Sequence, residues 1–214
     1  MPDTGPETPN SPTPNRYWSE RTDAIYLQYV YYIARTVARN ANSVLDVGSN
    51  NCDYLEWLYW IDRKYSLDRV SPYRSDTVTG VKADFYDWDH PHSFGLTMCL
   101  QTMEHVDDPE RFAAKLMDIS HHLIVSVPYM WPEVGAHVSH YLTEDDLARW
   151  FGRAPNCSFV VEEPFCEVAK SRRIVAYFDR KSPERRIGRG HRLKRRAADP
   201  AQDALAREDG PDPD

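Results

Sequence analysis

A Glu-His pair and two further histidines are the side chains best suited to chemistry. Glu104 and His105 are adjacent, and His137 and His140 follow in the run GAHVSHYLTEDDL. An imidazole has an unperturbed pKa of about 6.5, so it can take up a proton near neutral pH. Glu104 and His105, with His137 or His140, could also offer a carboxylate and two imidazoles to magnesium, manganese or zinc. Structural or surface roles for these histidines are the alternative.

A second group combines acidic residues with a tight turn. Asp46 lies at the end of the apolar run SVLDVG, the turn contains Gly48 and Asn50, and Asp68 follows the next apolar run. In a parallel sheet the first strand-to-helix turn is where a nucleotide-like cofactor meets backbone amides, and an acid after the next strand can hold its ribose. The spacing therefore predicts such a cofactor. The alternative is that these acids only cap turns or helices.

Apolar periodicity predicts the elements that would position these groups. A leading helix is expected where Ile25, Tyr29, Ile33 and Val37 recur at every fourth position. SVLDVG is expected to be a buried strand, with CDYLEWLYWI forming a helix entered directly from the turn. Six further strands are expected at Tyr65–Leu67, Gly80–Lys82, Leu96–Leu100, His122–Val127, Phe159–Val161 and Ile174–Phe178.

Two more helices are expected between these strands. They cover DPERFAAKLMDIS and TEDDLARWFG, and in the second Thr143 is the expected N-cap, with Asp146 three positions later. Strands alternating with helices are typical of an α/β fold with a doubly wound, mainly parallel sheet, here of seven strands.

Composition predicts one domain between two tails. Residues 1–15 are rich in Pro, Thr and Asn, and residues 182–214 are first basic and then acidic, so both tails are expected to be disordered. Residues 16–181 form the expected domain, which includes the leading helix. The chain has 214 residues, of which 41% are hydrophobic, enough for a sizeable core.

Charge and hydropathy narrow the expected partners. A formal charge of -7 argues against a broad nucleic-acid footprint on the folded part and favours a small-molecule partner. No apolar run approaches the roughly 18 to 20 residues that span a bilayer, and the start resembles no signal peptide, so a cytoplasmic protein with no membrane partner is expected. The sequence does not indicate an oligomeric state.

Four segments together resemble the class I S-adenosylmethionine-dependent methyltransferases. They are SVLDVGSNNCDYLEWL, YSLDRV, VKADFYDW and SFGLTMCLQTMEHVDDPERFAAKL, and the resemblance covers roughly residues 42–179. It implies S-adenosylmethionine as cofactor. The resemblance implies that Asp46, Gly48 and Asn50 line the methionine end of the cofactor and that Asp68 binds its ribose. Asp84 and Phe85 would contact the adenine, and Gln101 would lie where cofactor and acceptor meet. The acceptor pocket would be lined by Tyr129, Trp131, His137 and His140.

The turn departs from the usual GxGxG pattern, because Asn50 replaces its second glycine. Asparagine tolerates left-handed backbone angles better than most residues, so the turn is expected to survive the change.

Methyl transfer from a sulfonium is an in-line displacement, and a hydroxyl acceptor reacts faster when a base removes its proton. His105 is the expected base, with Glu104 beside it. The Glu104-His105 pair also resembles the ExxEH metal motif of ubiquinone-pathway and small-RNA 2′-O-methyltransferases. The first Glu of that motif is Gln101 here, an uncharged ligand, so a divalent metal is not favoured.

The leading hypothesis for function is O-methylation of a small molecule such as a sugar or a secondary metabolite, with N-methylation as an open alternative. One alternative is a metal-assisted RNA 2′-O-methyltransferase. Another is a noncatalytic binding protein of the same fold, which the substitution at Asn50 motivates.

Overall fold

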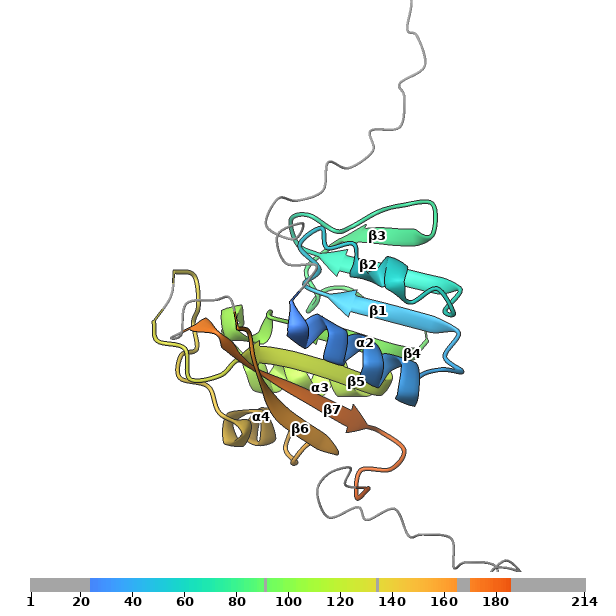
Figure 1. The fold of residues 1–214 in the computed structure, drawn as a ribbon. Helices are drawn as coiled ribbons and strands as arrows, with labels where there is room; N and C mark the ends of the chain where they lie inside the picture. Colours follow the sequence, from blue (N-terminus) through green and yellow to red (C-terminus); the bar gives the residue numbers. More distant parts are fainter. Residues whose placement is uncertain (1–23, 91, 134, 165–169, 186–214) are drawn as a thin grey trace, which may run out of the picture.

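The computed structural model describes residues 24–90, 92–133, 135–164 and 170–185. Its strands form one seven-stranded sheet in the order β3-β2-β1-β4-β5-β7-β6 (Figure 1). Strands β1 to β5 are parallel, and β7 runs antiparallel to both β5 and β6. The strands are β1 (Ser43–Val47), β2 (Arg63–Asp68), β3 (Val78–Lys82), β4 (Phe94–Leu100), β5 (Ser120–Pro128), β6 (Cys157–Glu162) and β7 (Arg172–Asp179). The predicted mainly parallel sheet is confirmed, including all seven strand positions.

Helical elements cover both faces of the sheet. Helix α2 (Ile25–Val37) and the 3₁₀ turn η1 (Tyr54–Trp57) pack on one face, and α3 (Pro109–Ile119) and α4 (Glu144–Trp150) pack on the other. Successive residues of a strand point to opposite faces, so within β1 Val44 joins one hydrophobic cluster and Leu45 the other. This burial on both faces confirms the doubly wound arrangement.

The leading helix forms as predicted, but its buried face differs from the expected stripe. Its fully buried residues are Tyr26, Leu27, Val30 and Ala34, whereas Tyr29 is 46% exposed. A spacing of four residues advances about 40° around an α-helix at each step, so the expected stripe does not stay on one face.

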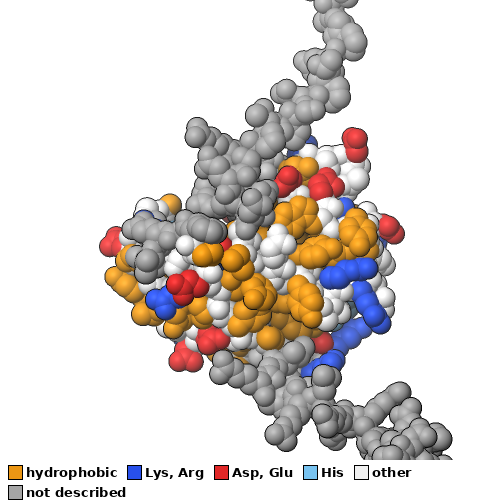
Figure 2. Space-filling model, viewed as in Figure 1, with side chains coloured by type: hydrophobic (Ala, Val, Ile, Leu, Met, Phe, Trp, Pro, Cys, Tyr) orange, Lys and Arg blue, Asp and Glu red, His pale blue; other side chains and the backbone are white. Residues whose placement is uncertain are grey.

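Two tyrosines of this helix, Tyr29 and Tyr31, pack against neighbouring aromatic rings, whereas Tyr32 is 69% exposed. Tyr29 meets Phe159 edge to face, with ring centroids 5.2 Å apart, and Tyr31 meets Trp60 in the same way at 5.7 Å. Figure 2 shows hydrophobic side chains gathered on this face of the molecule. The rings therefore cover the core, as an amphipathic helix requires.

The helix predicted for CDYLEWLYWI is wrong, because the chain forms only the 3₁₀ turn η1 and further turns there. The buried residues Cys52, Leu55, Leu58 and Ile61 recur every third position, which is the 3₁₀ period. The backbone follows the same spacing: the amides of Cys52, Leu58 and Ile61 each donate to the carbonyl three residues earlier.

Helices α3 and α4 confirm their predicted segments and start at side-chain caps. The Asp108 carboxylate accepts from Arg111 N at 3.0 Å, and Pro109 occupies the first turn of α3. Thr143 and Asp146 form the predicted capping box of α4, with Thr143 N donating to Asp146 Oδ2 at 2.9 Å.

The predicted tails lie almost wholly outside the described residues, which begin at residue 24 and end at residue 185. Both tails and the domain limits therefore stay predictions. Among the described helices, none has the length and apolar character needed to cross a membrane.

Candidate functional site

The turn after β1 holds an unusual backbone. Gly48 has φ of +80°, and its amide donates to Leu67 O at 2.8 Å. A Cβ atom at Gly48 would lie 2.3 Å from Thr102 Oγ1, so glycine is required both by the backbone angle and by the close packing of Thr102. Asn50 and Asn51 are left-handed, with φ of 42° and 58°, and this is how the turn survives without a second glycine.

Asp68, at the end of β2, ties this turn to the next loop. Its Oδ2 accepts from Asn50 N at 2.9 Å, and its Oδ1 accepts from Val70 N at 2.7 Å and Ser71 N at 2.9 Å. A carboxylate has about four acceptor positions, so one remains for a further hydroxyl donor. Asp68 is therefore both an organiser of the turn and a candidate ribose ligand.

Asp84 lies beside Asp68 at the same edge of the sheet. Ala83 N donates to Asp68 O at 3.2 Å, and Arg69 Nη1 is 3.9 Å from Asp84 Oδ2. The two carboxylates thus stand at neighbouring strand ends, as the sequence predicts. The Phe85 ring is 4% exposed and packs on Phe112 at 4.7 Å, so its backbone is the part left to contact a ligand.

Asp46 is a buried carboxyl without a full set of partners. It is 1% exposed, and its Oδ2 has no hydrogen-bond partner among the described residues. Burial raises its pKa to about 7, while the nearby Tyr54 hydroxyl lowers it and Asp68 raises it further. The orphaned oxygen and the Gly48 cradle fit the ammonium group of S-adenosylmethionine at the methionine end of the cofactor.

Glu104 lies in a 3₁₀ turn, η2 (Met103–His105), directly after β4. It is 1% exposed, and its Oε2 has no hydrogen-bond partner among the described residues. Burial raises its pKa to about 8, and the Arg173 guanidinium opposes that rise. The Glu104 carbonyl accepts from Val138 N at 2.8 Å and Ser139 N at 3.0 Å, which fastens the loop after β5 to η2.

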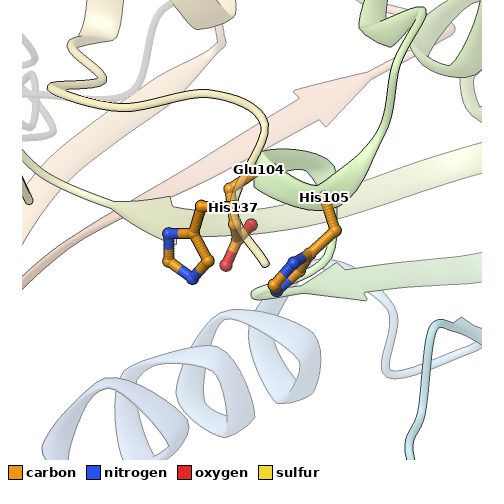
Figure 3. Close-up of side chains that lie close together, drawn as sticks. All are labelled: Glu104, His105 and His137. Atoms are coloured by element: carbon orange, nitrogen blue, oxygen red, sulfur yellow. The ribbon is translucent and has the colours of Figure 1, made fainter. Parts of the chain in front are cut away.

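His105 is oriented by the same loop. Its Nδ1 lies 3.0 Å from Ala136 O, and because a carbonyl only accepts, Nδ1 carries the hydrogen and Nε2 of the neutral ring carries a lone pair. The His105 and His137 rings meet edge to face at 4.6 Å. Ligand atoms of Glu104, His105 and His137 all lie within 4.8 Å of one another, with the three side chains facing each other in Figure 3.

His137 belongs to a stack of rings. Trp131 stacks on it at 6.2 Å and His140 at 6.4 Å. Burial, followed by the neighbouring His105 and His140, lowers the pKa of His137, which favours the neutral, metal-binding form. Of the two loop histidines that the sequence offers, the structure brings His137 to Glu104 and His105 and leaves His140 outside that group.

The remaining predicted residues are held by neighbouring strands. Trp131 Nε1 donates to Arg172 O at 2.7 Å, and Tyr129 N donates to the same carbonyl at 3.0 Å. Gln101 has φ of 52°, and its Nε2 donates to Ser126 Oγ at 3.2 Å. These contacts hold Tyr129, Trp131 and Gln101, which form a wall beside Glu104, His105 and His137.

Sequence reasoning missed a buried ion pair that anchors α2 near this wall. The Glu163 carboxylate accepts from Ile25 N at 2.8 Å and Tyr26 N at 2.9 Å, so it caps the helix from the far end of the sequence. Arg173 Nη1 is 4.0 Å from Glu163 Oε1, and its Cζ is 5.1 Å from the Trp131 ring. No local pattern signals contacts that join positions so far apart.

We expect the stability of the metal-free protein to fall as pH rises from about 5 to 8. The folded protein keeps Glu104 protonated up to its pKa of about 8, whereas the unfolded chain releases that proton near 4.5, so folding binds a proton in this window. The loss is about 1.4 kcal/mol per pH unit, and Asp46 adds to it up to its pKa of about 7. Urea unfolding at several pH values in chelator would measure the slope.

Glu104→Gln should reduce this slope and leave the part that Asp46 contributes, whereas Glu133→Gln, at an exposed position, should leave the slope unchanged. An identical slope in Glu104→Gln and wild type would contradict the buried, protonated carboxyl.

Comparison with solved structures shows a known fold. The 1,6-didemethyltoxoflavin-N1-methyltransferase of Burkholderia thailandensis, with bound 1,6-didemethyltoxoflavin and S-adenosylhomocysteine, is 17% identical with a TM-score of 0.59, over 73% of this chain and 78% of that chain. The N-methyltransferase NodS from Bradyrhizobium japonicum WM9, in complex with S-adenosylhomocysteine, is 12% identical with a TM-score of 0.57, over 74% and 89%. The N-terminal domain of EvdMO1 with bound S-adenosylhomocysteine is 14% identical with a TM-score of 0.51, over 71% and 79%.

These likenesses show that the chain has the Rossmann-like fold of the class I S-adenosylmethionine-dependent methyltransferases. No protein-family model matches the sequence, and no curated protein does.

Proposed function

We propose that this chain is an S-adenosylmethionine-dependent methyltransferase whose acceptor is a hydroxyl group of a small molecule. The observation that carries the proposal is the junction of two sites at one edge of the sheet. Thr102 packs against the Gly48 turn, and Glu104 and His105 follow it within three residues. Cofactor turn and candidate base are therefore held by one short segment.

The cofactor would be held by the residues that end β1, β2 and β3. Asp46 would meet its ammonium group, the Gly48 and Asn50 turn would follow its backbone, Asp68 would accept from the ribose, and Asp84 would face the adenine, together with the Phe85 backbone. Gln101 would lie at the reacting end. When bound, S-adenosylmethionine supplies an electrophilic methyl group on a sulfonium.

The chain's own part in the reaction is to orient the acceptor and to take its proton. Nε2 of His105 is unprotonated in the neutral ring, because Nδ1–H donates to Ala136 O. Nε2 can therefore accept the hydroxyl proton as the oxygen attacks, while Trp131 and Tyr129 wall the acceptor against water.

A metal-assisted form of the same transfer is the second candidate. It is favoured by Glu104, whose Oε2 has no hydrogen-bond partner among the described residues and whose carboxylate has an oxygen within 4.8 Å of ligand atoms of His105 and His137. A divalent ion bound there would lower the pKa of a coordinated hydroxyl. The Nδ1–H of His105 on a backbone carbonyl is the outer-shell contact that metal-binding histidines commonly make.

Calorimetry with S-adenosylhomocysteine, followed by a mass-spectrometric screen of hydroxyl-bearing metabolites and sugars with S-adenosylmethionine, tests the proposal. We expect binding, and a product heavier by one methylene. Absence of binding would instead support a noncatalytic protein of this fold. Repeating the active reaction after chelation, and then with magnesium, manganese or zinc restored, separates the two candidates, because full activity in chelator excludes the metal.

A further inference from the structure

A cleft of about 450 Å³ lies at the opposite end of the sheet from the Gly48 turn. It is lined by the C-terminal end of α2, the segment leading into β1, the first residues of β4 and β5, and Lys181 just beyond β7. Asn42 and Gly48 flank opposite ends of β1 and lie six residues apart, which is about 20 Å along an extended strand. The cleft is therefore a separate feature from the candidate active site.

The charged side chains that line this cleft are basic. Arg39 and Lys181 are exposed, His121 and His122 are partly buried, and no Asp or Glu lines the cleft. Neither Arg39 nor Lys181 forms an ion pair with a carboxylate of the described residues. In Figure 2, Lys and Arg side chains gather beside the C-terminal end of α2. This grouping stands out in a chain whose formal charge is -7.

The nearby carboxylates are already occupied. Asp118 pairs with Arg180, whose Nη2 is 3.7 Å from Asp118 Oδ1. Asp179 accepts at Oδ1 from Lys181 N at 2.8 Å and from Ser182 N at 3.1 Å. Arg180 offsets the charge of Asp118, whereas Asp179 keeps its negative charge and acts on His122. Arg39 and Lys181 therefore bring two positive charges to the cleft against the one charge of Asp179.

Polar groups around the cleft also favour an acceptor ligand. His121 Nδ1 is buried and has no hydrogen-bond partner among the described residues. Two carbonyls at the end of α2 already accept hydrogen bonds: Ala34 O accepts from Ala38 N at 2.9 Å, and Ala38 O accepts from Ala41 N at 3.0 Å and Trp60 Nε1 at 3.2 Å. The full charges of Arg39 and Lys181 have to outweigh the partial negative charge of this helix end for an anion to bind.

We propose that this cleft binds the phosphate group of a small molecule, at a second site that Arg39, Lys181 and His121 form. Cationic side chains make strong, charge-assisted hydrogen bonds to phosphate oxygens. The volume lies within the range of about 300 to 1,000 Å³ that is usual for small-molecule pockets. The proposal does not depend on methyl transfer, because the two sites share no residue.

Titration of the full chain with sodium pyrophosphate, at constant ionic strength, tests this site. We expect saturable heat of binding in calorimetry. Arg39→Gln and Lys181→Gln should each weaken binding about tenfold, since each removes one cation that faces the phosphate. Arg149→Gln, which removes an exposed arginine on α4, is the matched control and should bind as wild type does.

Affinity for S-adenosylhomocysteine should be the same in all four proteins. The pyrophosphate experiment can therefore fail without affecting the test of the proposed function, and the reverse also holds. Two results would overturn the inference: pyrophosphate heats no larger than those of sodium chloride, or equal weakening in Arg149→Gln. Binding of a single-stranded oligonucleotide without binding of pyrophosphate would also overturn it, and would assign the basic end to nucleic acid.

Discussion

Gly48→Ala is expected to abolish measurable cofactor binding and to destabilise the fold. The new methyl group would lie 2.3 Å from Thr102 Oγ1 and 2.4 Å from Thr102 Cγ2, and the residue would keep φ near +80°. Left-handed backbone in a residue other than glycine costs about 1 to 3 kcal/mol, and overpacking costs about as much again. Calorimetry with S-adenosylhomocysteine and urea unfolding would measure the two effects.

Gly152→Ala provides the matched control, because Gly152 also has positive φ, at +63°, but has open space around the position of a Cβ atom. It should lose only the backbone contribution of about 1 to 3 kcal/mol and no cofactor affinity. Adding Thr102→Ala to Gly48→Ala should restore part of the binding. If Gly48→Ala and Gly152→Ala behave alike, the close contact with Thr102 does not shape the turn.

His105→Ala should lower kcat by about 10²- to 10⁴-fold, the usual contribution of a positioned general base. Affinity for S-adenosylhomocysteine should be unchanged, because the side chain of His105 contacts Ala136 and His137, which are not among the proposed cofactor residues. Steady-state kinetics on the acceptor identified by the product screen would give the first value, and calorimetry the second.

His92→Ala, at an exposed position just before β4, is the control and should keep full turnover. His137→Ala distinguishes the two forms of the mechanism. If His137 is a metal ligand, its replacement should lower kcat as much as His105→Ala does and should also reduce the amount of bound metal. If His137 only neighbours His105, its replacement should lower kcat far less. Unchanged turnover in His105→Ala would remove His105 from the reaction altogether.

The fold could be predicted wherever one local pattern decides the structure. Buried parallel strands appear as short apolar runs, and Asp108 and Thr143 mark helix starts, so the sheet and α3 and α4 follow from the sequence. The CDYLEWLYWI segment is predicted wrongly because the spacing of its apolar residues is compatible with both an α-helix and a 3₁₀ turn. The spacing of three from Cys52 to Ile61 was the signal that could have separated them.

The candidate site was predictable in part, because the carboxyl ends of parallel strands meet at one edge. That rule places Asp46, Asp68, Asp84 and the Glu104-His105 pair together. It cannot choose between His137 and His140, since the path of a long loop depends on contacts such as Val138 N to Glu104 O. The roles proposed for these residues await the experiments above.

The single 3₁₀ turn between β1 and β2 has a consequence for cofactor choice. A full helix starting at Gly48 would aim the positive pole of its dipole at the ligand, which suits phosphates better than a sulfonium. This chain brings carboxylates to that place without such a pole. On the proposed function, the cofactor's positive charge would therefore meet carboxylates there and not the positive end of a helix.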